Sequence, residues 1–238
     1  MSDAQDRAAV VFGGSRGIGA ATVAALAAAG HPVFYTARQQ PATAPAPDAR
    51  FLPCDIRSPA QVEAVFAAME ASHGAPGVIV VNAGINVPPA PLADFPAERF
   101  ADLVAVNLTG AFTLLSSAAR HCADGASIVA MTTTLVRQPV PGTGPYSATK
   151  AAVEVLVRVM QRELAPRGVR VNAVAPGPVD TDLFRAGKDA AALARSAAMS
   201  PFGRVGTPAE VAAVIAFLAS DAASWVAGQI IQPNGAMA

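Results

Sequence analysis

Tyr146 and Lys150 are the two residues whose types and spacing first indicate chemistry. They stand four positions apart at the start of a long apolar segment, and residues i and i+4 share one face of a helix. An ammonium beside a phenol favours the phenolate, which otherwise forms only near pH 10. The pair therefore predicts an acid or base at Tyr146, although ordinary half-exposed helices also show this spacing.

A glycine-rich turn near the N-terminus is the second feature that indicates a ligand. An apolar run at residues 8–12 leads into GGSRGIG at residues 13–19, and an Ala-rich run follows to Ala29. This order is typical of a buried strand, a turn and a helix, the first half of a βαβ unit. Glycines at 13, 17 and 19 allow the backbone to approach a pyrophosphate at the helix N-terminus, where free N–H groups favour an anion.

The end of the second predicted strand, residues 33–37, bears on the choice of cofactor. A dinucleotide fold presents an acidic residue to the adenosine ribose there when the cofactor is NAD. This chain has Ala37 and then Arg38, and Arg16 lies in the glycine turn. Two guanidinium groups suit a 2′-phosphate, because Arg forms paired charge-assisted hydrogen bonds with phosphate oxygens. We therefore expect NADP(H), the alternative being two solvated surface arginines.

The remaining pattern predicts a parallel sheet covered by helices. Continuous apolar runs, typical of strands buried on both faces, predict further strands at 51–56, 78–81, 127–131, 168–174 and 228–232. Helices are expected at 59–73, 97–121, 146–165 and 208–220. Between them lie a proline-rich loop at 39–50 and a segment at 182–206, expected to be an irregular flap over the site. A length of 238 residues fits one α/β domain.

Polar residues follow several of these strands. Asn82-Ala83-Gly84 follows the strand at 78–81, and three threonines, at 132–134, follow the strand at 127–131. Ligands of an open parallel sheet lie beyond the carboxyl ends of its strands, so we expect these residues at one edge. Asn107 lies among apolar neighbours and needs hydrogen-bond partners, either as a structural amide or as part of a site.

Composition argues against several other classes of protein. The 17 basic and 17 acidic residues leave no excess charge for nucleic acid. Cys54 and Cys122 stand alone, which predicts neither a metal site nor a disulfide. The N-terminus lacks the pattern of a signal peptide, and no apolar run approaches the roughly 20 residues that span a bilayer. We expect a cytoplasmic protein with no membrane partner.

These motifs, in this order, resemble the short-chain dehydrogenase/reductase family over essentially the whole chain. The family pattern is Gly-xxx-Gly-x-Gly, an Asp after the third strand, Asn-Ala-Gly, a helix Asn, a Ser, Tyr-xxx-Lys and Pro-Gly. Here the corresponding residues are Gly13, Gly17 and Gly19, Asp55, Asn82-Ala83-Gly84, Asn107, Thr133, Tyr146 and Lys150, and Pro176-Gly177. The resemblance implies one Rossmann-like domain over 1–238, a doubly wound parallel sheet of about seven strands with helices on both faces.

The resemblance also implies roles. Tyr146 would give its proton to a substrate carbonyl, Lys150 would lower the pKa of Tyr146 and hold the nicotinamide ribose, and Asn107 would position a water for proton relay. Asp55 would bind the adenine and Thr181 the carboxamide. The residues implied at the cofactor are Gly13, Ser15, Arg16, Gly17, Ile18, Gly19, Arg38, Asp55, Ile56, Asn82, Ala83, Gly84, Tyr146, Lys150, Pro176, Gly177, Val179 and Thr181.

Three departures from the family pattern matter. Thr133 stands where the family has Ser, which predicts activity with an altered substrate range, with Thr132 or Thr134 as substitutes if the register differs. Phe12 replaces a hydroxyl residue before the first glycine, and the segment after Arg38 is short and proline-rich.

The sequence therefore predicts an NADPH-dependent carbonyl reductase, reversible as an alcohol dehydrogenase. The alternatives are a non-catalytic dinucleotide sensor or scaffold, and a halohydrin dehalogenase-like lyase, which the glycine turn and Lys150 disfavour. A hydrophobic substrate is expected, because the predicted wall of the substrate pocket is mostly apolar: Leu135, Val136, Val140, Pro178, Val179 and the flap. The helix at 146–165 is apolar nearly all round, so we expect a dimer or tetramer formed through it and the helix at 97–121.

Overall fold

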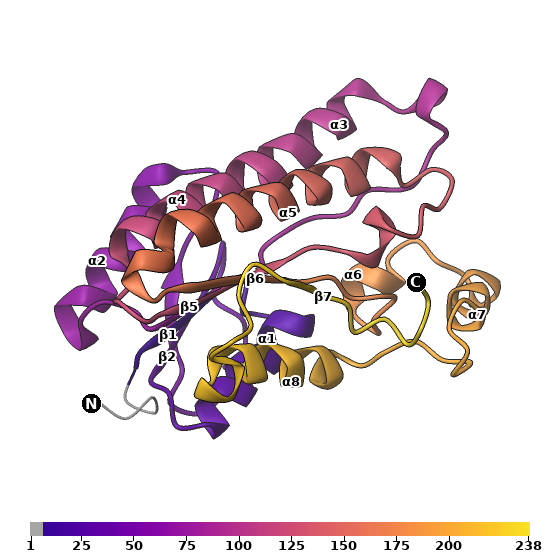
Figure 1. Cartoon of the computed structure of the whole chain (residues 1–238). Helices are drawn as coiled ribbons and strands as arrows, with labels where there is room; N and C mark the ends of the chain where they lie inside the picture. The colour runs from indigo at the N-terminus through magenta and orange to yellow at the C-terminus, as the bar shows by residue number, and fades with distance from the viewer. Residues whose placement is uncertain (1–6) are drawn as a thin grey trace.

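The computed structural model describes residues 7–238 and contains one sheet of seven parallel strands (Figure 1). The strand order is β3-β2-β1-β4-β5-β6-β7. The strands are Ala9–Phe12 (β1), Val33–Ala37 (β2), Arg50–Pro53 (β3), Val78–Val81 (β4), Ser127–Met131 (β5), Arg170–Val174 (β6) and Ile230–Ile231 (β7). The predicted Rossmann-like α/β sheet is confirmed, with β3 and β7 shorter than expected.

Helices cover both faces of this sheet (Figure 1). On one face α1 (Gly17–Ala28) packs against α8 (Pro208–Ala219). The other face is covered by α2 (Pro59–His73), α4 (Ala111–His121) and α5 (Gly144–Leu164). Short 3-10 helices lie at Leu92–Asp94, Thr134–Val136, Ala165–Arg167 and Asp221–Ala223.

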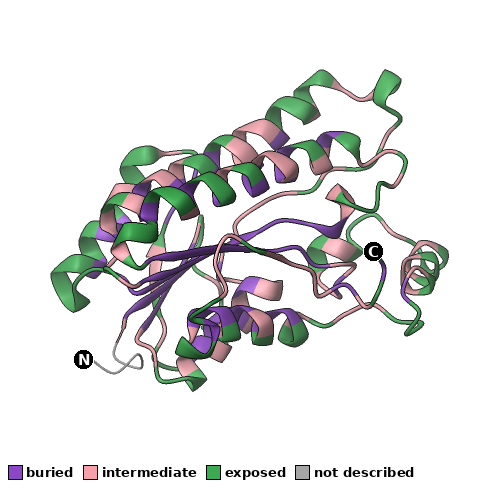
Figure 2. Ribbon diagram, viewed as in Figure 1, coloured by how far each residue is buried: buried purple, intermediate pink, exposed green. Residues whose placement is uncertain are grey.

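Each strand contributes to two cores, because successive side chains point to opposite faces of a sheet. In β1, Val10 and Phe12 pack beneath α2, α4 and α5, whereas Ala9 and Val11 pack against α1 and α8. All four side chains are fully buried, and Figure 2 shows the strands as the buried centre of the molecule. This two-sided burial is the physical reason for the continuous apolar runs in the sequence.

The strand order reverses at β1 and β4. From β1 the chain proceeds outward to β2 and β3, then returns to form β4 on the other side of β1. At such a switch point the connections leave in opposite directions and open a crevice beyond the carboxyl ends of the strands. The glycine turn and Asn82 follow β1 and β4 directly, so both lie at this crevice.

The predicted helix at 97–121 is interrupted in the structure. It consists of α3 (Ala97–Leu103), a π-helical segment at Val104–Gly110 and α4. Asn107 lies within the π-helical segment and is fully buried. Wide turns of this kind occur frequently at functional sites.

The same segment also bears on the expectation that no helix is long and apolar enough to cross a membrane. By length and composition alone, Ala97–His121 qualifies as a span, so that expectation is wrong. In the fold, its buried residues Leu103, Leu114 and Leu115 face the protein, and the last two belong to the core beneath α2, α4 and α5. Packing in the core therefore explains only part of the apolar composition, because 39% of the apolar stretch is buried.

The expectation of an irregular flap at 182–206 is also wrong in part, because the segment contains two helices. They are α6 (Asp182–Arg185) and α7 (Ala190–Ala198). The Thr181 side chain accepts a hydrogen bond from Phe184 N (3.1 Å), and Asp189 accepts one from Ala192 N (2.7 Å). Both are favourable N-cap residues. Sequence analysis missed these two helix starts because the flap consists mainly of small residues.

Candidate active site

The glycine turn is held tightly between β2 and β4. Gly13 N and Gly14 N donate to Thr36 O (3.1 and 3.0 Å), while Gly13 O accepts from Asn82 Nδ2 (2.8 Å). A Cβ on Gly19 would lie only 2.0 Å from Gly13 O. Gly19 therefore permits close packing of α1 on the turn. It lines neither cavity, and its contact with the cofactor stays a prediction.

A cavity of ≈ 840 Å³ opens in front of this turn. Arg16 precedes α1 without a side-chain hydrogen bond to the helix, so no side-chain cap satisfies the first N–H groups of α1 there. Gly17 has φ +55°, and a Cβ there would approach Thr181 Cγ2 to 3.1 Å. The predicted cofactor residues that line this cavity are Gly13, Ser15, Arg16, Gly17, Ile18, Arg38, Asp55, Ile56, Asn82, Ala83, Gly84 and Thr181.

Asp55 has a partner that the sequence analysis did not identify. Arg57 Nε donates to Asp55 Oδ1 (3.0 Å), and Arg57 Nη2 donates to Asp55 Oδ2 (2.5 Å). These hydrogen bonds lower the pKa of Asp55 to about 2. The carboxylate is thus ionised and already engaged, and Arg57 joins Arg16 and Arg38 at the same cavity.

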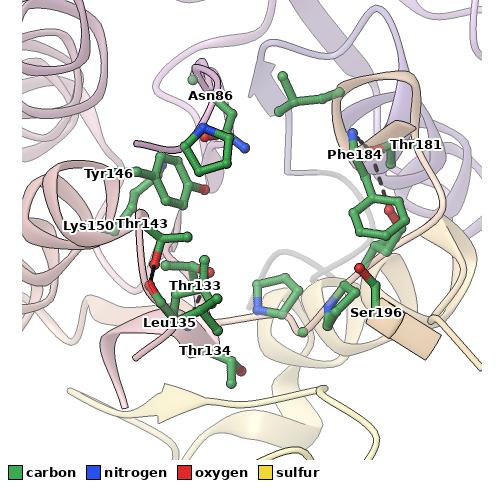
Figure 3. Close-up of a pocket in the computed structure, with 18 of the residues that line it drawn as sticks. Asn86, Thr133, Thr134, Leu135, Thr143, Tyr146, Lys150, Thr181, Phe184 and Ser196 are labelled. Atoms are coloured by element: carbon green, nitrogen blue, oxygen red, sulfur yellow. Dashed lines mark hydrogen bonds between the residues drawn. The ribbon is translucent and has the colours of Figure 1, made fainter. Parts of the chain in front are cut away.

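A second cavity, of ≈ 380 Å³, contains the other predicted chemical groups. Tyr146, Lys150 and Thr133 line it together, and Figure 3 shows Tyr146 and Thr133 on one side with Phe184 and Ser196 on the other. Six residues line both cavities, so the two are contiguous: Ile18, Asn82, Gly84, Ile85, Thr181 and Leu183. The remaining predicted cofactor residues, Pro176, Gly177 and Val179, line this second cavity.

Lys150 and Asn107 meet behind the pocket at Gly84. A Cβ on Gly84 would lie 3.1 Å from Asn107 Oδ1 and 3.4 Å from Lys150 Nζ. The Asn107 amide accepts from Ile85 N (2.8 Å) and donates to Ile85 O (2.9 Å). Its structural role, holding the loop after β4, is therefore present, whereas its water relay stays a prediction because Asn107 lines neither cavity.

The pKa values of the Tyr146–Lys150 pair are governed by burial. Burial raises the pKa of Tyr146 to about 12 and lowers that of Lys150 to about 8. The sequence predicted a lowered pKa for Tyr146, and the structure gives a raised one. The reason is that the loss of water disfavours the phenolate more than Lys150 stabilises it. The phenol is therefore protonated at neutral pH, as a proton donor must be. Lys150 Nζ donates to Met131 O (2.9 Å).

The three threonines after β5 differ in their hydrogen bonds. Thr132 Oγ1 donates to Val174 O (3.4 Å), and Thr134 Oγ1 donates to Ala175 O (2.9 Å). Thr133 Oγ1 instead accepts from Leu135 N (3.3 Å), which leaves its proton free. Thr133 is therefore the threonine best able to donate a hydrogen bond to a substrate.

A buried ion pair connects the threonine segment to α5. Arg137 donates to both carboxylate oxygens of Glu154 (2.9 and 3.0 Å), and Glu154 is buried. Glu154 lies one turn beyond Lys150 on α5, and Arg137 lies four residues beyond Thr133. The pair thus joins the two segments that bear the candidate catalytic groups, a role that the sequence gave no means of assigning.

The rest of the pocket wall is largely apolar. Leu135, Val140, Pro178 and Val179 line it as predicted, whereas Val136 does not. From the flap, the lining residues are Leu183, Phe184, Lys188, Ser196 and Met199. Sequence analysis also missed several residues from distant segments, namely Asn86, Val87, Pro89, Phe95, Thr143 and Met237. In residues 7–238, no group of acidic, His or Cys side chains is arranged to hold a metal ion.

Known proteins are similar in sequence to this chain over nearly its whole length. Residues 13–237 match a family model described as enoyl-(acyl carrier protein) reductase. A chloroplastic NADPH-dependent aldehyde reductase-like protein of Arabidopsis thaliana is 38% identical, with 96% of this chain and 93% of the relative covered. The chain belongs to the short-chain dehydrogenase/reductase family.

Two further comparisons extend this relationship. A 3-oxoacyl-acyl-carrier-protein reductase of Mycobacterium tuberculosis is 37% identical, covering 97% of this short-chain dehydrogenase/reductase and 92% of the relative. A solved structure of a doubly substituted short-chain dehydrogenase/reductase from Serratia marcescens superposes with a TM-score of 0.88, at 29% identity over 97% of each chain.

Members of this family are oxidoreductases that bind a nicotinamide dinucleotide, and the geometry of this short-chain dehydrogenase/reductase fits one. The absence of a Cβ at Gly17 leaves open the gap toward Thr181, beside the uncapped N-terminus of α1. A helix N-terminus of this kind favours a pyrophosphate. The contiguous cavities then extend from Arg38 at one end to Tyr146 at the other.

We expect Thr133→Ser to keep or raise the rate of carbonyl reduction and Thr133→Ala to lower kcat on the order of 10²-fold, the usual effect of losing one oxyanion donor. Steady-state kinetics with a reducible ketone measures both. The control is Thr134→Val, which removes the hydrogen bond to Ala175 O and should lower thermal stability more than kcat. Full activity of Thr133→Ala would contradict the assignment of Thr133 as a hydrogen-bond donor to the substrate.

Proposed function

We propose that this protein is an NADP(H)-dependent oxidoreductase that reduces a ketone or another carbonyl compound to an alcohol, reversibly. The observation that carries the proposal is the shared pocket of Tyr146, Lys150 and the free Thr133 hydroxyl, contiguous with the cavity at the glycine turn. The aldehyde reductase-like and 3-oxoacyl reductase relatives support the same reaction class.

Each of the candidate catalytic residues in the pocket has a separate role in such a reduction. NADPH, when bound, would supply the hydride for the carbonyl carbon. Tyr146 gives its phenolic proton to the carbonyl oxygen, while Thr133 donates a hydrogen bond to the same oxygen as its negative charge grows. Lys150, when protonated, stabilises the phenolate that remains on Tyr146. The apolar wall excludes water and so strengthens these interactions.

The preference for NADP(H) rests on Arg16 and Arg38. Both line the large cavity, and neither forms an ion pair with a carboxylate among residues 7–238. Arg57, by contrast, is already paired with Asp55. Two uncommitted guanidinium groups provide the paired donors that a 2′-phosphate requires.

Arg38→Asp should reverse much of this preference. We expect the ratio of kcat/KM for NADPH over NADH to fall on the order of 10- to 100-fold, because a charged hydrogen bond is replaced by like-charge repulsion. Arg162→Asp makes the same charge change on an exposed residue that lines neither cavity, and it should leave the ratio unchanged. An unaltered ratio in Arg38→Asp would refute the 2′-phosphate assignment.

The reaction itself is tested by following NADPH and NADH oxidation with a panel of aliphatic, aromatic and β-keto ester carbonyls. Turnover of at least one carbonyl supports the oxidoreductase. Tight NADPH binding without turnover of any carbonyl would instead favour the second candidate, a non-catalytic dinucleotide sensor. The aligned Tyr146, Lys150 and free Thr133 hydroxyl argue against that candidate.

We also propose that the protein forms an oligomer through α3, α4 and α5, which lie side by side (Figure 1). Their exposed side chains include Phe100, Phe112, Val155 and Val159, with Phe112 55% and Val155 57% exposed. Large exposed apolar groups gathered on one surface mark interaction sites. Light scattering should therefore give a dimer or tetramer for the wild type and a smaller species for Val155→Asp/Val159→Asp. A monomeric wild type would contradict this proposal.

A further inference from the structure

The charged groups of the substrate pocket are unusually few and of one sign. Within the described part of the chain, Lys150 and Lys188 are the charged side chains that line it, and no carboxylate does. Lys150 is buried beside Gly84 and belongs to the candidate catalytic group. Lys188 comes from the flap, between α6 and α7, and the reaction proposed above does not use it.

Lys188 lacks a charged partner, unlike Arg185 and Arg204 of the same flap. Arg185 pairs with Asp180 and Arg204 pairs with Glu210, but Lys188 forms no ion pair among residues 7–238. Its ammonium donates to Phe184 O and lies 4.2 Å from the centroid of the Phe184 ring. An ammonium has three donors, so two remain available.

The contact between Lys188 and Phe184 indicates where Lys188 lies relative to the candidate catalytic groups. Figure 3 shows Phe184 across the pocket from Tyr146 and Thr133. The lining of the pocket also includes apolar residues such as Leu135, Val140 and Met199. The pocket thus has the candidate catalytic groups on one side, apolar residues in its wall and a positively charged side chain on the flap.

A cation held in partly apolar surroundings favours an anionic ligand. Partial burial lowers the pKa of Lys188, which shows that its charge is incompletely solvated. A ligand carboxylate would restore that solvation and form charge-assisted hydrogen bonds with the free donors. Acidic residues would compete for the ammonium, and the pocket has none.

We propose that Lys188 binds an anionic group of the substrate, so that this enzyme prefers carbonyl compounds with an apolar spacer ending in a carboxylate or a similar anion. The proposal rests on the carbonyl reduction proposed above and names the substrate class for that site. Lys188 then acts as a specificity-determining residue, with no part in the proton or hydride transfer.

Neutral and anionic versions of one ketone test this directly. The probes are para-acetylbenzoate and straight-chain methyl-keto acids of increasing length, each paired with its methyl ester. We expect kcat/KM to favour at least one acid over its ester, and Lys188→Met to lower the value for that acid tenfold or more, the size of a lost charge-assisted hydrogen bond. The esters should change little, and Lys188→Arg should retain the preference.

Arg195→Met is the matched control, because Arg195 is an exposed cation of α7 that lines neither cavity. It should leave the acid-to-ester ratio unchanged, and thermal unfolding should show that both Met variants are folded. Turnover of the esters without any preference for an acid would overturn this inference and leave carbonyl reduction intact. A weaker Kd for NADPH in Lys188→Met would assign Lys188 to the cofactor and also overturn it. Turnover of another carbonyl in the panel above, with none on any acid or ester, would overturn this inference alone. Absence of turnover on the whole panel would overturn both proposals.

Discussion

Replacement of Tyr146 with phenylalanine will lower kcat for carbonyl reduction by about 10³-fold or more, the upper range for losing a general acid. The change removes the phenolic proton and leaves the ring, so the pocket keeps its shape. Burial already holds the pKa of Tyr146 at about 12, which keeps the donor protonated through the neutral range. Dinucleotide binding should persist, because the glycine turn and Arg38 are untouched. Steady-state kinetics and NADPH titration separate the two effects.

The pH profile of the wild type provides a second readout of the same pair. Burial lowers the pKa of Lys150 to about 8, so its ammonium is present below that pH and is lost above it. The rate of carbonyl reduction should therefore fall as pH rises through about 8, while Tyr146 itself remains protonated. Retained turnover in Tyr146→Phe, or a rate that rises across this interval, would contradict the assigned roles.

Alanine at Gly19 will disrupt the dinucleotide site without touching a ligand. Its Cβ would lie 2.0 Å from Gly13 O and 2.6 Å from Asn82 Nδ2, and the first of these atoms is backbone, which cannot rotate away. We expect a loss of stability on the order of 2–3 kcal/mol from overpacking. The displaced turn should also weaken NADPH binding at least about tenfold, since the N–H groups at the start of α1 shift with it.

Urea unfolding and fluorescence titration with NADPH measure these two losses. Gly206→Ala is the control, because the nearest atom to a Cβ there is Pro178 O at 3.6 Å, an ordinary contact. It should change neither stability nor affinity appreciably. Wild-type affinity in Gly19→Ala would show that the turn tolerates displacement and that its geometry does not govern cofactor binding.

The seven strands and most helices were predictable from the sequence because their burial is two-sided or periodic. Val78–Val81 is apolar at every position since both faces of β4 are covered. The glycine turn was equally legible, because only residues without a Cβ allow the approaches seen at Gly13 and Gly19. Features of this kind depend on residues that are close in sequence, so the sequence alone predicts them.

The flap and the helix predicted at 97–121 were not predicted correctly from local sequence patterns. The segment at 190–198 consists mainly of small residues, with Leu193 as its one large apolar side chain. Its helix was missed although Ala favours helices and Asp189 caps it. The π-helical turn around Asn107 depends on the partner of that amide, the Ile85 backbone 22 residues away. Neither propensity nor periodicity specifies such a contact.

The sequence alone predicted the candidate catalytic residues Tyr146 and Lys150, and a hydroxyl residue before them. This was possible because one helix turn and one strand end are local features of the chain. The sequence did not show which hydroxyl stays free, since this depends on the carbonyls of Val174, at the end of β6, and Ala175, just after it, which accept from Thr132 and Thr134. The folded chain likewise commits Asp55 to Arg57 and brings Lys188 to the pocket. These assignments depend on which hydrogen-bond and charge partners remain once distant segments have packed together.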